Sequence, residues 1–157
     1  MTELEELKQQ VSYILKRINE LETQGDETDN RWKPNVGEDF WRVSAGGDVY
    51  KAEWDNDGFD NNIFNHTDIF PTEEEAYLDK GRKQIRRELM KYGKDFESGG
   101  DNWTFNYNYR DKIIGYWNSK YSCHPFAIYF ESKEIAEKAV EEVGSERIKK
   151  YLFGVED

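Results

Sequence analysis

One loop and one pair of adjacent residues contain the side chains that could do chemistry. The loop, residues 55–62, combines three aspartates with three asparagines, and oxygen-rich loops of this kind can hold calcium. Its spacing misses the EF-hand order, because Phe59 occupies a ligand position and the twelfth position holds no glutamate. A solvated turn explains the loop better. Because His66, Cys123 and His124 are the only good zinc ligands in the chain, we expect no metal and no cofactor.

Cys123 and His124 are the pair that could act as a nucleophile and a base. Adjacent residues of an extended segment point to opposite faces, so the pair would need a third group from elsewhere. The chain has no Gly-rich phosphate loop and no G-x-S-x-G sequence. Its consecutive acids Glu73, Glu74 and Glu75 suit the start of a helix. We therefore expect a protein that is not an enzyme.

The charge of the chain is acidic and unevenly placed. It has 22 Lys and Arg against 33 Asp and Glu, a net charge of −11, which opposes direct binding to nucleic acid. Residues 53–79 contain no Lys or Arg, whereas residues 80–94 contain seven against one acid. A helix with an acidic start and a basic end explains part of this pattern. The remainder predicts a surface with an acidic region and a basic region. The predicted partner-binding acidic patch consists of Glu53, Asp55, Asp57 and Asp60.

The first 24 residues predict an amphipathic helix with coiled-coil spacing. Apolar residues recur every three or four positions, separated by Glu, Lys, Gln and Arg. These seam residues are Leu4, Leu7, Val11, Ile14, Ile18 and Leu21. The apolar residues of the seam do not distinguish a coiled coil of two helices from one of three. Leu15 widens the apolar stripe, so that larger bundles are also compatible with the sequence. Although three heptads are short, we favour a homo-oligomer over a helix that lies on its own domain.

A short sequence occurs twice and predicts the architecture. Residues 70–76 and 130–136 share the pattern F-x-[ST]-x-E-x-A, and each copy follows a pair of tryptophans. Strands are predicted at 40–43 and 49–54, with residues 63–70 as a third strand or extended segment, and again at 103–109, 113–117 and 126–130. A turn is predicted at Gly46-Gly47 and a loop at 55–62. Helices are predicted from the Thr72 cap to about Tyr92, from about Lys133 to Val143, and from a Ser145 cap onward.

The expected fold class is α+β. A coiled-coil helix, residues 1–24, is followed by a linker, residues 25–31, and by two tandem ββ(β)α units, residues 32–94 and 95–157, the second ending in a short helix. The strands would form antiparallel sheet packed by helices. Cys123 has no partner for an internal disulfide, the N-terminus lacks signal-peptide features, and no apolar run is long enough to span a bilayer. We expect a cytoplasmic protein without a membrane partner.

These motifs resemble those of small uncharacterised accessory proteins of phages and prophages of low-GC Gram-positive bacteria. The resemblance covers most of residues 31–153 and lies in an aromatic hairpin, W-x-N-D, the two F-x-[ST]-x-E-x-A sequences and a terminal Tyr-Leu-Phe. The matching residues are Trp41, Gly47, Val49, Trp54, Asn56, Asp57, Phe70, Thr72, Glu74, Glu75, Ala76, Phe130, Ser132, Glu134, Ala136 and Tyr151 to Phe153. Pro71 departs from the pattern and changes little. The resemblance implies no activity, but it implies a setting in which inhibitors of host defence are common.

Three functions remain open. The first is an inhibitor that binds a host defence protein, such as a CRISPR-Cas effector, and occludes it with acidic charge in the host cytoplasm. The second is an oligomeric sponge for a nucleotide immune signal, with aromatic rings stacking on the base and arginines holding phosphate. Its residues would be Arg86, Arg87, Tyr107, Tyr109, Trp117 and Tyr121. The third is a structural or regulatory phage subunit. Aromatic residues at strand spacing are more often core than ligand platform, so we rank the sponge below the inhibitor.

Overall fold

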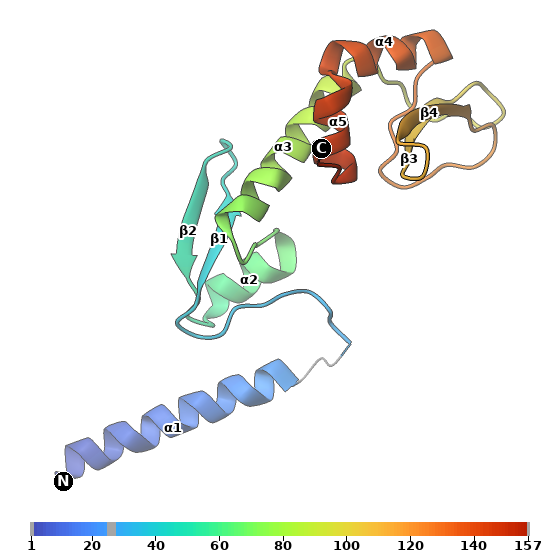
Figure 1. Ribbon diagram of the computed structural model, residues 1–157. Coiled ribbons are helices and arrows are strands. Elements are labelled where there is room, and N and C mark those ends of the chain that lie inside the picture. Colours follow the sequence, from blue (N-terminus) through green and yellow to red (C-terminus); the bar gives the residue numbers. More distant parts are fainter. Residues whose placement is uncertain (1, 25–27, 157) are drawn as a thin grey trace. The chain divides into compact units, whose positions relative to one another are not determined.

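Residues 2–24 and 28–156 are described in a computed structural model of the protein (Figure 1). Within them the fold is α+β, with five helices and two antiparallel sheets of two strands each. The chain forms two compact units, residues 1–76 and 77–157. The α+β class and the N-terminal helix are confirmed. The proposed repeat boundary at residues 94 and 95 stays a prediction.

The N-terminal helix α1 spans Glu3–Gln24. A reciprocal cap, which the sequence analysis missed, fixes its start. The Thr2 hydroxyl accepts the Glu5 N–H at 3.3 Å, and the Glu5 carboxylate accepts the Thr2 N–H at 2.9 Å. Residues 25–27 of the predicted linker lie outside the described residues.

The first unit continues with a hairpin, β1 (Asp39–Val43) and β2 (Val49–Glu53), followed by helix α2 (Gly58–His66). The strands pair from Asp39 opposite Glu53 to Val43 opposite Val49. Gly47 adopts a φ of 90° in the turn, as the predicted hairpin requires. The core of this unit consists of Phe40 in β1, Trp54 directly after β2, and Ile63 in α2.

The predicted loop at 55–62 and the predicted strand at 63–70 are wrong for residues 58–66, which form α2. The Asp57 carboxylate accepts the Asp60 N–H at 2.8 Å and caps the helix. The helix places Ile63 and Phe64 beside Trp54, and the Trp54 and Phe64 rings meet edge-on at 6.4 Å. Only Phe70 of the predicted strand pairs with another residue in extended fashion, as an isolated bridge with Trp41.

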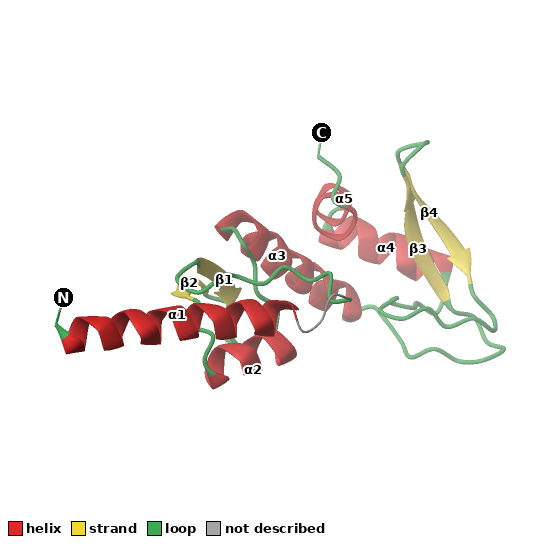
Figure 2. Cartoon of the chain, turned by 90° about the horizontal axis from the view of Figure 1, so that it is seen from below, coloured by secondary structure: helices red, strands yellow, loops and turns green. Residues whose placement is uncertain are grey.

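Helix α3 (Glu73–Met90) leads to the second hairpin, β3 (Trp103–Asn108) and β4 (Ile113–Asn118), and then to α4 (Lys133–Val143) and α5 (Ser145–Phe153). Figure 2 shows the hairpin in yellow and the helices in red. The core of the second unit is built by one buried set from α3, α4, α5 and the segment before α4. Its members are Ile85, Leu89, Phe130, Ala136, Ala139, Val140, Val143 and Ile148.

Three details of this unit differ from the prediction. The predicted strand at 126–130 is not formed: of its residues, Tyr129 and Phe130 pair only as isolated bridges, with Lys94 and Trp103. Ser145 does not cap α5: it is the first helical residue, and Gly144 at a φ of 106° occupies the cap without a side-chain hydrogen bond. Tyr109 lies beyond the end of β3, in the turn, rather than in the strand. Its ring nevertheless meets that of Tyr107 edge-on at 4.9 Å.

Both copies of the repeated sequence adopt the same local structure. Phe70 bridges Trp41 in the first hairpin, and Phe130 bridges Trp103 in the second, both antiparallel. The hydroxyl oxygens of Thr72 and Ser132 accept the N–H three residues later, at 3.2 and 3.1 Å. Each alanine that ends the pattern, Ala76 and Ala136, is fully buried. Each copy of the repeat therefore forms the same local structure. A phenylalanine pairs with a tryptophan of the hairpin, and a helix capped by a hydroxyl follows.

Candidate functional site

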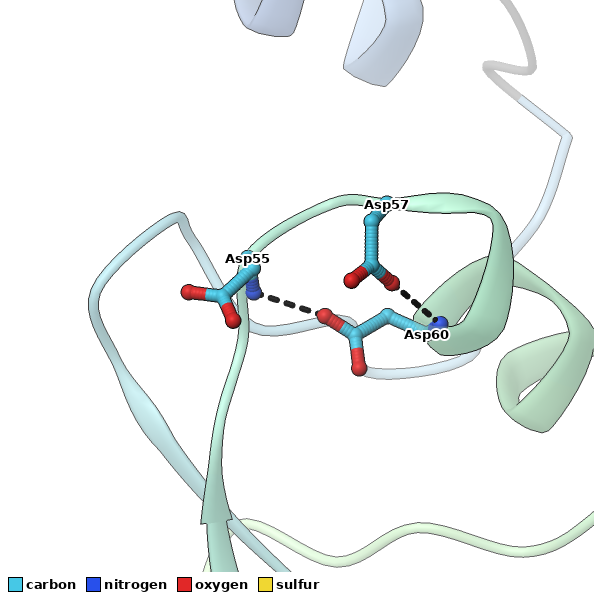
Figure 3. A group of neighbouring side chains, drawn as sticks. All are labelled: Asp55, Asp57 and Asp60. Atoms are coloured by element: carbon cyan, nitrogen blue, oxygen red, sulfur yellow. Dashed lines mark hydrogen bonds between the residues drawn. The ribbon is translucent and has the colours of Figure 1, made fainter.

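The predicted acidic patch lies where β2 ends and α2 begins (Figure 3). One carboxylate oxygen from each of Asp55, Asp57 and Asp60 lies within 4.8 Å of the others. Asp60 is 6% exposed, and its carboxylate accepts the Asp55 N–H at 2.7 Å. Asp57 caps α2 through the Asp60 N–H. These two acids therefore brace the loop, because their oxygens satisfy backbone donors at the turn.

The exposed part of the acidic patch is smaller than the sequence predicted. Glu53, Asp55 and Asp57 are exposed, whereas Asp60 is buried. Exposed carboxylates can approach a cation on another protein without the desolvation that a buried charge requires. The candidate contact surface, which we call the acidic edge, consists of Glu53, Asp55 and Asp57.

The charge of the protein is divided between the two units. Residues 31–76 contain eleven Asp and Glu against four Lys and Arg, a net charge of −7. Residues 77–157 contain fourteen against fifteen, a net charge of +1. The remaining −5 belongs to residues 1–30, with eight acids and three bases. The negative field thus comes from the first unit, which also contains the acidic edge.

Two aspartates outside the acidic edge have lowered pKa values because cations hold their charged form. The side-chain hydrogen bond from Arg31 lowers the pKa of Asp29 to about 2, with a contact of 2.7 Å between Nη2 and Oδ2. In the second unit, hydrogen bonds from Lys120 and Asn118 lower the pKa of Asp101. The Lys120 to Asp101 contact measures 2.6 Å. Both acids are paired locally and form no part of the acidic edge.

The predicted seam of α1 is exposed along its whole length. The exposed fractions of its apolar side chains fall between 44% for Ile18 and 61% for Leu4 and Leu15. Leu7, Val11, Ile14 and Leu21 lie between these values, and Tyr13 beside them is 70% exposed. A run of large apolar side chains on one helix stripe is unfavourable in water and is typical of an interaction surface.

The residues proposed for nucleotide binding are divided between different surfaces. Arg86 lines a groove with Phe126 and donates from Nη1 to the Phe126 carbonyl at 2.5 Å. Tyr107 and Tyr109 line another hollow, where Tyr107 stacks on Phe153 at 5.7 Å. Trp117 meets the His124 ring edge-on at 5.2 Å. Arg87 and Tyr121 are exposed. Tyr107 and Trp117 are therefore engaged in packing within the protein, whereas Tyr109 is 62% exposed and Tyr121 is 78% exposed.

The groove at Arg86 has a volume of about 490 Å³ and combines cations of α3 with an apolar floor. Arg82, Lys83 and Arg86 line it beside Phe105 and Phe153. Asp79 pairs with Lys83 at 2.9 Å and with Arg82 at 3.7 Å, so part of this positive charge is neutralised inside the groove. Phe126 at its rim is 86% exposed and adopts a φ of 67°, a feature that no sequence signal identified.

Cys123 and His124 are both exposed and lie on the segment before Phe126. The His124 N–H is donated to the hydroxyl of the buried Tyr129 at 2.7 Å. His124 thus meets Tyr129 through its backbone and Trp117 through its ring. These contacts hold the segment against Trp117 and Tyr129.

No match was found when the chain was compared with protein-family models, with curated proteins and with solved structures. Among the described helices, none has both the length and the apolar character needed to cross a membrane. Function must therefore be argued from the exposed stripe of α1 and the acidic edge.

Proposed function

We propose that this chain is a non-enzymatic binding protein that self-associates through α1 and inhibits a bacterial defence component by occupying one of its basic surfaces. The observation that carries the proposal is the stripe of apolar side chains on α1, each 44–61% exposed. Burying such side chains between copies contributes about 1.5–3 kcal/mol for each one that becomes fully buried. Assembly through a coiled coil is the most economical way to cover the stripe.

We propose that the chain consists of a coiled-coil helix followed by two tandem ββ(β)α units. The shared aromatic bridge, hydroxyl cap and buried alanine of the two repeats support this arrangement. Within residues 2–24 and 28–156 we identify no assembled nucleophile, base and oxyanion donor, and we therefore propose binding rather than catalysis.

The partner follows from the charge of the first unit. The net charge of −7 on its residues 31–76 and the exposed acidic edge favour a partner with a basic surface, such as the nucleic-acid channel of a CRISPR-Cas effector. The resemblance to phage accessory proteins supports this setting and a host cytoplasmic location. An acidic surface can stand in for phosphates and exclude the nucleic acid by occlusion.

Affinity capture from a Gram-positive host lysate tests this proposal with three forms of the chain. The wild type is compared with Glu53→Gln/Asp55→Asn and with a matched control, Asp48→Asn/Glu74→Gln, which removes the same two charges elsewhere on the first unit. We expect one large basic protein with the wild type and the control, and its loss with the acidic-edge variant. The same set of proteins from all three forms would contradict the proposal.

Native mass spectrometry of the protein purified from cells distinguishes the inhibitor from the nucleotide sponge, which is the main alternative. A discrete additional mass of one nucleotide per protomer, together with an empty capture, would replace the inhibitor by the nucleotide sponge. A bare protein that assembles but captures nothing would favour the structural or regulatory subunit.

A further inference from the structure

The charges beside the seam of α1 determine which way two copies can run. With Leu4, Val11 and Ile18 at a and Leu7, Ile14 and Leu21 at d, the flanking e positions are Lys8, Leu15 and Glu22. The flanking g positions include Glu3, Gln10 and Arg17. Charged residues at e and g meet across a coiled-coil interface and set partner choice and orientation. The four charged members of this set are all exposed.

In a parallel coil, each g residue faces the e residue five positions later on the other copy. Glu3 then meets Lys8 of the second copy, and Arg17 meets Glu22. Both pairs are of opposite charge, and two-fold symmetry repeats each of them. Gln10 and Leu15 form the remaining pair and carry no charge. The parallel arrangement therefore has attractive pairs at both ends of the seam and no repulsive pair.

An antiparallel coil of the same helices loses these pairs. Full overlap of the apolar seams places Leu4 beside Leu21 of the other copy, so that g faces g and e faces e. Gln10 then meets Arg17, and Lys8 meets Leu15. None of these pairs joins opposite charges. The comparison favours the parallel coil, although two contacts within one chain compete with the pair of Arg17 and Glu22. Arg17 forms a salt bridge with Glu20 at 3.2 Å, and the Glu22 carboxylate accepts a hydrogen bond from the Asn56 amide at 2.5 Å.

We infer that α1 binds α1 of a second copy in parallel and in register, selected by the pairs Glu3 with Lys8 and Arg17 with Glu22. This inference rests on the self-association in the proposed function and adds its direction. In a parallel coil, both chains leave the same end of the coil after Gln24. The acidic edges of two copies are then tethered at one end, so that one bound copy raises the effective concentration of the other at the same partner.

Disulfide trapping with single cysteines tests the direction. The starting form is Cys123→Ser, because Cys123 is the one native thiol and is exposed. Leu4→Cys and Leu21→Cys are then introduced separately and allowed to equilibrate in a glutathione redox buffer. Positions 4 and 21 are about 26 Å apart along a helix, which is too far for a disulfide. In a parallel coil each variant cross-links to itself, and we expect a covalent dimer from both variants alone.

The antiparallel result is distinct. There, neither variant cross-links to itself, but a mixture of the two does, and this outcome would overturn the inferred direction while leaving self-association intact. A Cys123→Ser chain with the mass of one protomer at all concentrations would instead contradict the self-association in the proposed function.

A charge exchange tests the selecting pairs without a cysteine. Lys8→Glu places two glutamates opposite each other at one end of the parallel seam, and we expect the dissociation constant of self-association to rise about tenfold. Glu3→Lys/Lys8→Glu restores opposite charges and should restore the constant. The matched control is Lys16→Glu at the outer f position, which changes the same charge away from the seam. Equal weakening by Lys8→Glu and Lys16→Glu would overturn the assigned pairs.

Discussion

Asn102 organises the loops at the base of the second hairpin, and it is fully buried. Its amide nitrogen donates to the carbonyls of Glu97 and Ser119 at 2.8 and 2.9 Å, and its amide oxygen accepts the Glu97 N–H at 2.8 Å. These bonds satisfy backbone groups that would otherwise be buried without partners. A buried asparagine used in this way is a structural residue rather than a ligand-binding one.

We predict that Asn102→Ala lowers the free energy of unfolding by about 2–4 kcal/mol, because it leaves several backbone groups unpaired. Asn106→Ala, at an exposed position of β3, is the control and should change it by less than about 0.5 kcal/mol. Urea unfolding followed by tryptophan fluorescence measures both. Equal effects of the two substitutions would show that the Asn102 bonds add nothing to stability.

Gly81 is a second residue with a strict role, because it lies inside α3 where alanine is usually preferred. A Cβ at this position would lie 2.2 Å from Cε1 of the Tyr151 ring, which packs on the glycine from α5. The glycine therefore permits a close approach of two helices within the second unit. Its role is steric, since its backbone is ordinary helix.

Gly81→Ala should destabilise the protein by about 1–3 kcal/mol, since the overlap with Tyr151 exceeds the gain in helix propensity. In a Tyr151→Ala background the same substitution should stabilise by about 0.5–1 kcal/mol. A double-mutant cycle by thermal unfolding gives both values. If Gly81→Ala has one sign in both backgrounds, the ring is not the reason for the glycine.

At the scale of elements, substitutions in α1 test whether its apolar seam forms an interface between copies of the chain. We predict that Leu7→Ser/Ile14→Ser/Leu21→Ser reduces the solution mass to that of one 18.7 kDa chain, because the d positions then bury polar groups. Light scattering after size exclusion measures the mass of this variant and the wild type over a concentration series. The control Ser12→Ala/Lys16→Ala changes the outer face and should keep the wild-type mass. An unchanged mass in the triple variant would place the seam outside any interface.

The hairpins, α3 and α4 were accessible from sequence because their signals are local. Alternation of aromatic residues predicts β3, and the Ser132 hydroxyl with a following apolar period predicts α4 from about Lys133 to Val143, where the helix is found. Helix α2 was missed for a physical reason. Its Asp and Asn residues are common in turns as well as in helix caps. Packing of Ile63 and Phe64 on Trp54 stabilises the helix over a turn. That contact is tertiary and leaves no periodic signal in nine residues.

The candidate site was only partly accessible for a related reason. Clustering of acids in the sequence identified Glu53, Asp55 and Asp57, which are exposed. The same pattern could not distinguish Asp60, whose burial depends on the turn into α2. Of the aromatic residues proposed for nucleotide binding, Tyr107 of β3 packs on Phe153 and Trp117 of β4 packs on His124, and both partners come from other elements. Composition identifies residue types, and tertiary packing decides which of them reach solvent.

At the scale of the whole molecule, the separation of charge between the two units is the property most relevant to function. A net charge of −7 on residues 31–76 favours fast encounter with a basic partner and makes binding sensitive to salt. We predict that Glu53→Gln/Asp55→Asn weakens binding to the captured partner by about tenfold and reduces its salt dependence. Surface plasmon resonance between 50 and 500 mM salt, roughly a threefold range in Debye length, measures both quantities. An affinity and a salt slope equal to those of Asp48→Asn/Glu74→Gln would exclude the acidic edge from the interface.

The most direct test of the account is the plating efficiency of a defence-sensitive phage on a panel of Gram-positive hosts, each with one active defence system and expressing the wild-type chain or Glu53→Gln/Asp55→Asn. We expect the wild type to raise plaque numbers on one host of the panel and the variant to leave them unchanged. Equal plaque numbers with the wild type, with the variant and without the protein, on every host whose defence is shown to be active, would contradict inhibition of a defence component.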